Sequence, residues 1–361
     1  MNPAQRLSQL GQSLWLDNIT RDLLDGGGLE HYIRDFAVTG LTSNPTIYDK
    51  AIAGSTAYDA EIEASAEAGR SAEDTFFELA LADLRRAADL FAPVHARTEG
   101  VDGYVSLEVS PLLAYDAATT AKEAVRLHAL GGRPNLLIKI PGTAEGLTAI
   151  EEAIFAGVPV NVTLLFSPEH YRGCLEAYTR GVERRVEAGL PAHVASVASV
   201  FVSRWDGATA STAPEALRNR LGLLVGRQSY AVYRAFFATD RWQRLLNLGA
   251  RPQRLLFAST GTKDPAAPDD LYVAGLAAPH TVNTMPEETL KAYADHGRAV
   301  GPLLVDPAAD AALAQEFETA GISLAELSAQ LQTKGAAAFV DSWNAMLGRI
   351  QAKSGADKVR A

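Results

Sequence analysis

Short apolar runs alternate along the chain with longer stretches whose apolar residues recur at helical spacing. Eight runs have the length and β-branched content of strands: SLWLDNI, VTGLTSN, GYVSLEVS, NLLIKIP, PVNVTLLF, VASVASVFVS, RLLFAST and TVNTM. Helical patterns lie between them, at residues 117–130, 143–156, 168–188, 215–246 and 287–297. Strands that alternate with helices are typical of βα units around a parallel sheet. The pattern therefore predicts an α/β protein with a parallel sheet, and eight strands suit a barrel.

Two stretches exceed this repeat. Residues 51–98 are rich in Ala and Glu and predict helices in the connection between the second and third strands. Residues from about 302 to 361 have a helical pattern throughout, and we expect them to pack across the barrel as an extension. No low-complexity linker divides the chain, so we expect a single domain over residues 1–361, with the barrel at about 13–300.

Alternation within each strand separates an apolar face from a polar one, because successive strand side chains point to opposite sides. In the third strand, for example, Val105 and Leu107 take one face, and Ser106 and Glu108 take the other. If the apolar face meets the helices, the polar face points into the barrel, near the strand ends where barrel active sites are built. The inward polar set comprises Asp17, Asn44, Glu108, Lys139, Asn161, Thr163 and Ser199.

Lys139 is the unusual member, because it interrupts the apolar run NLLIKIP. A buried ammonium without a partner is costly. One reading is that the lysine reaches solvent at the strand end, or forms a structural ion pair with Asp17 or Glu108. Polar residues of matching alternation on several strands favour a reactive site instead.

A deprotonated lysine in such a site is a nucleophile for a ketone carbonyl, and the resulting iminium withdraws electrons from the adjacent carbon–carbon bond. Asp17 and Glu108 could divide the proton transfers. This chemistry requires neither a metal nor an organic cofactor. Arg204 and Lys263 follow the sixth and seventh strands, where this fold often binds phosphate, although the sequence fits surface cations equally well.

Composition narrows the classes of partner. The chain has 361 residues, 47% of them hydrophobic, a net charge of −10 and a pI of about 5.3. It lacks a Lys/Arg-rich run, so we expect no nucleic acid and no membrane surface as partner. The N-terminus does not read as a signal peptide, and no apolar run is long enough to span a bilayer.

Cysteine and histidine usage points the same way. Cys174 is the single cysteine, which excludes an intrachain disulfide and a Cys-based zinc site, so a cytoplasmic protein is expected. The seven histidines lack the spacing of a metalloprotease motif, and Gly26-Gly27-Gly28 lacks the spacing of a nucleotide-binding loop. We expect the histidines at the surface or in packing contacts, and the glycines in a turn.

The sequence resembles the transaldolases of the pentose phosphate pathway over about residues 13–297. The resemblance rests on segments in family order: WLDNITRDLL, GLTSNPTIYDKAI, VSLEVSPLLA, NLLIKIPGTAEGLTAIEEAIFAGVPVNVTLLFSPEHY, SVASVFVSRWD and HTVNTMPEETL. The segment RPQRLLFASTGTKDP is similar to the longer bacterial form. The resemblance implies a (β/α)8 TIM barrel with extra helices, and no cofactor.

The resemblance also implies residue roles. Lys139 would be the Schiff-base lysine, and Asp17 the acid/base that acts on the C4 hydroxyl. Glu108 and Thr163 would hold the water that relays protons. The substrate-binding residues implied are Asn44, Asn161, Ser199, Phe201, Arg204, Ser259 and Lys263.

The phosphate site departs from the family pattern. Where the short transaldolases carry Ser-Phe-Arg after the seventh strand, this chain has Ser259-Thr260-Gly261. The arginine is missing, and Lys263 is its candidate substitute.

The implied enzyme is a transferase of aldehyde or ketone residues. It moves a dihydroxyacetone unit from sedoheptulose 7-phosphate or fructose 6-phosphate to glyceraldehyde 3-phosphate or erythrose 4-phosphate. Family members are often homodimers, so the resemblance is compatible with a homodimer, and the sequence does not specify the oligomeric state. Two alternatives remain: a fructose-6-phosphate aldolase-like enzyme that releases free dihydroxyacetone, and a non-catalytic barrel that binds sugar phosphates.

Overall fold

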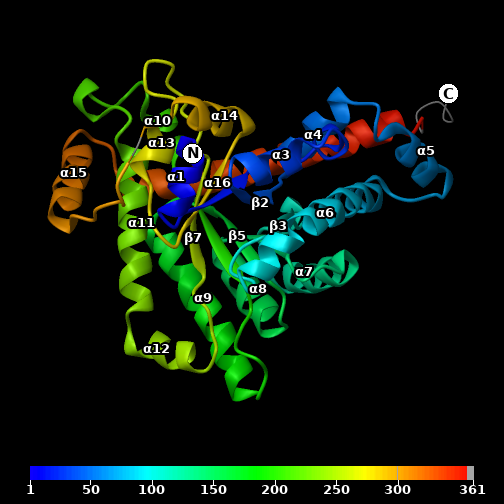
Figure 1. The fold of residues 1–361 in the computed structure, drawn as a ribbon, viewed down its shortest axis with the longest axis horizontal. Helices are drawn as coiled ribbons and strands as arrows, with labels where there is room; N and C mark the ends of the chain where they lie inside the picture. Colours follow the sequence, from blue (N-terminus) through cyan, green and yellow to red (C-terminus); the bar gives the residue numbers. More distant parts are fainter. Residues whose placement is uncertain (299, 356–361) are drawn as a thin grey trace.

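Eight parallel strands close into a barrel in chain order (Figure 1). The computed structural model describes residues 1–298 and 300–355. The strands are β1 Ser13–Leu16, β2 Val38–Thr42, β3 Val105–Glu108, β4 Leu136–Pro141, β5 Val160–Leu165, β6 Ser196–Phe201, β7 Arg254–Ala258 and β8 Val282–Met285. β8 pairs with β1 and so completes the ring. Each predicted strand segment contains one of these strands, which confirms the (β/α)8 TIM barrel.

Helices surround the barrel and fill its long connections. Up to β4 they are α1 Pro3–Gln9, α2 Arg21–Asp25, α3 Gly28–Asp35, α4 Pro45–Gly54, α5 Asp59–Glu67, α6 Ala72–Arg97, the 3-10 turn η1 Pro111–Leu113 and α7 Ala117–Gly131. Between β4 and β7 they are α8 Ala144–Phe155, α9 Pro168–Glu187, α10 Ser203–Thr209, the 3-10 turn η2 Glu215–Leu217, α11 Leu221–Phe237 and α12 Asp240–Asn247. The remaining helices are α13 Leu271–Gly275, α14 Glu287–His296, α15 Pro307–Thr319 and α16 Leu324–Lys353.

The single helix predicted over residues 215–246 is wrong, because three elements occupy this stretch. Asn219 adopts a left-handed backbone (φ 59°) between η2 and α11, which a continuing α-helix does not allow. At the other break, the Thr239 side chain accepts a hydrogen bond from Trp242 N and caps α12. The Thr239-Asp240 pair is typical of a helix start, but the prediction followed the apolar periodicity, which continues across this pair.

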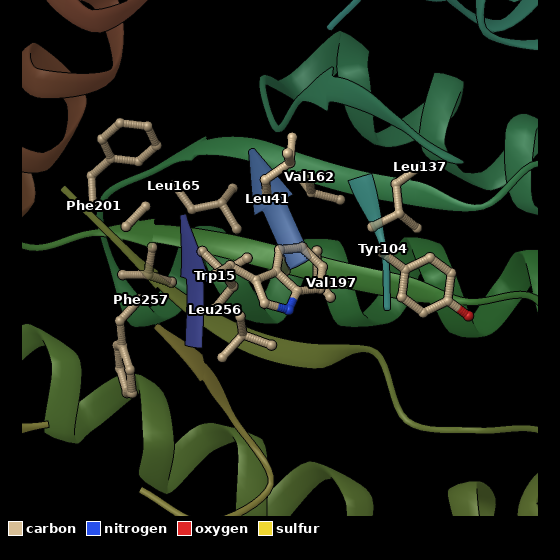
Figure 2. Packing of buried hydrophobic residues seen from close by; sticks show 14 of the residues in the cluster. Trp15, Leu41, Tyr104, Leu137, Val162, Leu165, Val197, Phe201, Leu256 and Phe257 are labelled. Atoms are coloured by element: carbon tan, nitrogen blue, oxygen red, sulfur yellow. The ribbon is translucent and has the colours of Figure 1, made fainter. Parts of the chain in front are cut away.

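The middle of the barrel is filled by apolar side chains. Figure 2 shows Trp15, Leu137, Val197 and Leu256, from four strands, packed together. Trp15, Leu137 and Val197 each lie two residues before a residue of the predicted inward polar set. Residues two positions apart on a strand point to the same side. The inward side of these strands is therefore apolar near the strand start and polar near the strand end.

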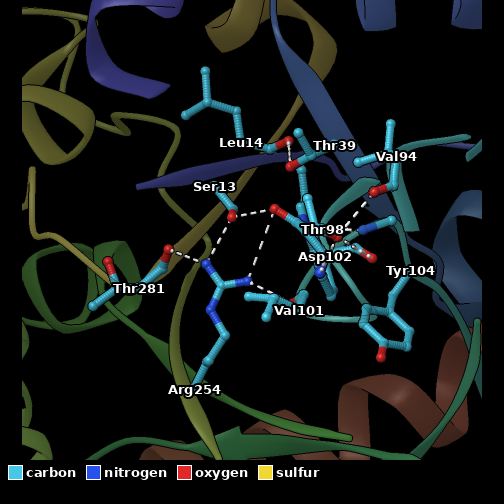
Figure 3. A network of polar contacts seen from close by, with 12 residues as sticks. Ser13, Leu14, Thr39, Val94, Thr98, Val101, Asp102, Tyr104, Arg254 and Thr281 are labelled. Atoms are coloured by element: carbon cyan, nitrogen blue, oxygen red, sulfur yellow. Dashed lines mark hydrogen bonds and ion pairs between the residues drawn. The ribbon is translucent and has the colours of Figure 1, made fainter. Parts of the chain in front are cut away.

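A polar network lies at the amino end of the barrel (Figure 3). The Asp102 carboxylate, before β3, accepts hydrogen bonds from the Ser13 hydroxyl and from Trp15 Nε1, the latter at 2.8 Å. Arg254 of β7 lies 3.8 Å from the same carboxylate and donates to Ser13 Oγ at 2.6 Å and to the Thr281 carbonyl at 2.9 Å. This network ties β1, β3, β7 and β8 together at the amino end of the barrel.

The C-terminal extension crosses the molecule. In Figure 1, α16 runs from the barrel along α4, and α15 lies beside α11 on the other side of the molecule. Two polar contacts fix α16 to α4: Ser342 Oγ to Thr46 Oγ1 at 2.8 Å, and Arg349 Nε to Asp49 at 2.8 Å. The predicted helical extension is confirmed as far as Lys353, and residues 356–361 lie outside the described residues.

None of the helices within residues 1–298 and 300–355 combines the length and the apolar content needed to cross a membrane.

Candidate active site

Lys139 lies inside the barrel, on the fourth strand, with only 4% of its surface exposed. β3 and β4 pair so that Glu108 is directly beside it, and Nζ is 3.2 Å from Glu108 Oε2. The amine also donates a hydrogen bond to the Ser43 carbonyl at 3.3 Å. A positive charge in this apolar strand therefore has a buried carboxylate and a backbone carbonyl as partners.

Asp17 follows β1 and faces the same hollow from the other side of the barrel. Its Oδ1 accepts a hydrogen bond from the Thr42 hydroxyl at 2.7 Å, and Thr42 contacts Thr284 on β8 at 2.7 Å. Removal from bulk water raises the pKa of Asp17, while the positive charge of Lys139 acts in the opposite direction.

The pKa of Glu108 is shifted the same way. Burial raises it, the nearby Lys139 ammonium lowers it, and the negative charge of Asp17 adds to the rise. Two carboxyls and one amine therefore share a poorly hydrated space, which is the environment in which proton transfer is tuned toward neutral pH.

A layer of amide and hydroxyl groups lies beside the lysine. Asn161 pairs with Lys139 across β4 and β5. It donates through Nδ2 to Ser106 Oγ at 3.1 Å and accepts through Oδ1 from the Ser199 hydroxyl at 2.8 Å. These bonds join β3, β5 and β6 and hold the Asn161 amide in one orientation.

Thr163 is fully buried two residues further along β5. Its hydroxyl has no hydrogen-bond partner among residues 1–298 and 300–355. Buried polar groups are rarely left unpaired, and exceptions often mark functional positions.

A cavity of about 280 Å³ opens above the lysine at the carboxyl ends of the strands. Of the residues predicted for the site, those that line it are Asp17, Asn44, Lys139, Ser199, Phe201, Arg204, Ser259 and Lys263. Glu108, Asn161 and Thr163 are not in its lining, although Glu108 touches the lysine and Asn161 touches Ser199.

Arg204 and Lys263 supply positive charge to this cavity. The Arg204 guanidinium lies over the Phe201 ring, 5.2 Å from its centroid, and burial lowers its pKa while Asp17 opposes the change. Ser259 lies nearby with a left-handed backbone (φ 56°), and its hydroxyl contacts Ser203 Oγ at 2.9 Å. A non-glycine residue in this strained conformation is often found at a binding site.

Asn44 lines the cavity and also caps a helix. Its side chain accepts a hydrogen bond from Ile47 N at 3.1 Å and caps α4, with Pro45 at the first helical position. The start of α4 is thereby fixed at the rim of the cavity.

Sequence reasoning missed several lining residues. Thr284 on β8 and Lys50 on α4 contribute polar groups, and Phe339 on α16 contributes a ring. Phe339 lies 5.6 Å (ring centroid) from Lys139 Nζ. Strand alternation could not have predicted it, because it comes from a helix, 200 residues after Lys139 in the sequence.

The described residues contain no group of three or more His, Cys, Asp or Glu side chains arranged to hold a metal ion. They do contain a buried lysine beside two carboxyls, with amide and hydroxyl groups and two cations around it. A lysine can act as a nucleophile, amides and hydroxyls can hydrogen-bond a sugar, and cations can bind an anionic group.

The chain is similar to known proteins over nearly its whole length. The model of the family Transaldolase/Fructose-6-phosphate aldolase matches residues 14–350. A transaldolase of Arthrobacter sp. (strain FB24) is 45% identical over 97% of this chain and 96% of its own length. Similar proteins with the same name are found in Thermobifida fusca (45% identical, 97% of each chain) and Parafrankia sp. (42%, 98% of each).

Proposed function

This chain belongs to the transaldolase/fructose-6-phosphate aldolase family, and on that premise we propose that it is a transaldolase with Lys139 as its Schiff-base nucleophile. The observation that carries the proposal is the buried contact between Lys139 and Glu108, at 3.2 Å, beneath a cavity that Asp17 also lines. A barrel that only binds sugar phosphates has no use for this combination of groups.

Substrate binding would use the two cations and the amide layer. Arg204 and Lys263 meet the phosphate of a ketose phosphate, which leaves the sugar chain to extend across the cavity toward Lys139. Asn44 and Ser199 line the same cavity and can hydrogen-bond the sugar hydroxyls.

Attack on the C2 carbonyl requires the amine of Lys139 to be neutral, and Glu108 is the carboxylate placed to accept its proton. The amine adds to C2, water leaves, and an iminium forms. Glu108 and the free hydroxyl of Thr163 are suited to hold the water that carries protons in this step.

Cleavage follows from the opposite side of the cavity. The Asp17 carboxylate removes the proton of the C4 hydroxyl, the C3–C4 bond breaks, and its electron pair neutralises the iminium to give an enamine. The released aldehyde leaves, and an acceptor aldehyde takes its place. C3 of the enamine then attacks the acceptor carbonyl, Asp17 returns the proton, and water releases the new ketose from Lys139.

The second candidate is release of free dihydroxyacetone, because the family that matches this chain includes fructose-6-phosphate aldolases. Two residues favour transfer. The hydrolytic relatives tend to carry glutamine and tyrosine at the positions of Glu108 and Phe201. The relatives named transaldolase also match this chain over nearly its whole length.

Borohydride reduction tests the nucleophile. With fructose 6-phosphate present, we expect reduction to leave a covalent dihydroxyacetone or hexose adduct on the peptide that contains Lys139. The variant Lys139→Met should fold, gain no adduct and lose turnover. A wild-type protein without any mass increase would contradict the proposal.

Acceptor dependence tests the reaction class. We expect fructose 6-phosphate to be consumed rapidly with erythrose 4-phosphate and slowly without it. Equal release of dihydroxyacetone in both incubations would identify the hydrolytic enzyme instead.

A further inference from the structure

Phe339 reaches the catalytic cavity from α16, outside the eight βα units. Its ring faces Lys139 Nζ, with 5.6 Å between the nitrogen and the ring centroid, and only 4% of the residue is exposed. We propose that Phe339 keeps water away from the covalent intermediate on Lys139 and so commits the enzyme to transfer. This inference rests on the proposed function and deepens it.

The groups around the Lys139 amine differ in their capacity to hold water. Glu108 and the Ser43 carbonyl approach the amine with oxygen atoms, whereas Phe339 presents an aromatic face. An aromatic face tolerates a cationic nitrogen but offers water only a weak hydrogen-bonding surface. The side of the amine that Phe339 covers is therefore its apolar side.

α16 is held in place on both sides of Phe339. Two turns before it, Gln332 Nε2 donates to the carbonyls of Gly142 and Leu164, each at 3.0 Å. One turn after it, Ser342 contacts Thr46 at 2.8 Å. Because both anchors lie at the carboxyl end of the barrel, the ring between them has a defined position over the cavity.

Close approach of the helix depends on Gly335. A Cβ atom at this position would come within 3.1 Å of the Leu164 side chain and within 3.3 Å of the Phe166 ring, tighter than most such contacts. Leu164 itself has a left-handed backbone (φ 60°) where the pairing of β5 with β6 shifts register. This irregularity places the Leu164 carbonyl where Gln332 binds it.

Water diverts the intermediate in two successive steps. It first supplies a proton to C3 of the enamine, which restores the iminium. A second water then adds to C2, the carbon–nitrogen bond breaks, and free dihydroxyacetone leaves with the amine regenerated. The first step competes with attack of C3 on the acceptor aldehyde, so a barrier to water other than the one that Glu108 and Thr163 are proposed to hold favours transfer.

The test compares two rates in variants of residue 339. We expect Phe339→Ala to raise the ratio of acceptor-free dihydroxyacetone release to acceptor-dependent transfer by about tenfold or more, a difference in barriers of about 1.4 kcal/mol. Phe339→Val keeps part of the apolar contact and should raise the ratio less. If the alanine variant fails to fold, the valine variant decides the question.

Met346→Ala is the matched control. Met346 is fully buried on the same helix but does not line the cavity, so its truncation loosens the packing of α16 without opening a path to Lys139. We expect its ratio to equal that of the wild type. An increase of the same size in Met346→Ala would overturn the inference, because it would assign the effect to the helix as a whole.

Borohydride trapping separates the two hypotheses. If wild-type protein and Phe339→Ala both give the Lys139 adduct while the ratio is unchanged, the shielding role is wrong and the Schiff-base function stands. If wild-type protein gives no adduct, the proposed function itself fails.

Discussion

At the scale of single residues, the pKa values of Asp17 and Glu108 determine the pH range in which the proposed mechanism operates. Burial raises both, and the cation of Lys139 limits the rise in both. The two carboxyls interact with each other and with Lys139, so protonation of one changes the pKa of the other.

The first prediction concerns the acid side of the pH profile. The mechanism needs ionised carboxylates, and a raised pKa means that they are protonated, and activity lost, at a higher pH than for exposed groups. We expect the acidic midpoint of kcat/KM to lie above the pKa values of unperturbed Asp and Glu, which are about 3.9 and 4.3. Samples returned to neutral pH should recover fully, and a midpoint near pH 4 would contradict the raised values.

The second prediction concerns Glu108→Gln. The substitution keeps the shape but removes the proton acceptor beside Lys139. We expect kcat to fall by about 10²–10⁴-fold, the usual contribution of a general acid/base, in a steady-state assay with fructose 6-phosphate and erythrose 4-phosphate. A loss below about fivefold would show that protons reach the lysine by another route.

The third prediction uses Thr163. Its hydroxyl is buried and unpaired within the described residues, so Thr163→Val removes no protein hydrogen bond. We expect thermal stability to stay equal or increase, since loss of an unsatisfied buried polar group is not costly, while turnover falls. Loss of stability with unchanged turnover would identify the hydroxyl as structural.

Strand alternation predicted much of the site because it is a local rule. It groups Lys139, Glu108 and Asn161 on the inward faces of three neighbouring strands, and the strand pairing places them side by side. The rule is silent about Ser43, whose carbonyl binds Lys139, and about Phe339, because both depend on how distant segments pack. The residues alone indicated a lysine nucleophile and proton transfer by Asp17 and Glu108, and the family resemblance added the finer roles, such as the action of Asp17 on the C4 hydroxyl.

At the scale of elements, α16 differs from the helices that belong to the barrel repeat. Its inward residues approach the strand ends and not the strand faces, through Gln332, Gly335 and Phe339. The helical pattern of residues 302–361 predicted the element, but a pattern contains no information about the partner of a helix face. The sequence predicted a helical extension packed across the barrel, but not the break between α15 and α16 or the residues that α16 contacts.

The fourth prediction concerns the docking of this helix. Gln332→Ala leaves the Gly142 and Leu164 carbonyls without the amide that bridges them. We expect a loss of about 1–3 kcal/mol in the free energy of unfolding, measured with denaturant. Thr333→Ala, on the exposed side of the next position, is the control and should change stability far less.

At the scale of the whole molecule, the two ends of the barrel have separate tasks. The cavity with Lys139 lies at the carboxyl ends of the strands. The network of Ser13, Asp102 and Arg254 lies at the amino end (Figure 3). In barrel enzymes the first end carries chemistry and the second stability.

The fifth prediction tests this separation. Asp102→Ala leaves Trp15 Nε1 without its acceptor and the buried end of Arg254 without its carboxylate. We expect a loss of about 2–4 kcal/mol in the free energy of unfolding, with kcat/KM at low temperature within about threefold of the wild-type value. A large drop in kcat/KM in a fully folded sample would show that the two ends are coupled.

The order of the elements along the chain has a consequence for biosynthesis. A ribosome completes β8 at Met285 well before it adds α16, which begins at Leu324. A barrel that formed at that stage would hold Lys139, Asp17 and Glu108 beneath a cavity that α16 does not yet cover. If the Phe339 ring excludes water from Lys139, a chain that ends before α16 would convert ketose phosphate to free dihydroxyacetone and not transfer the unit to an acceptor.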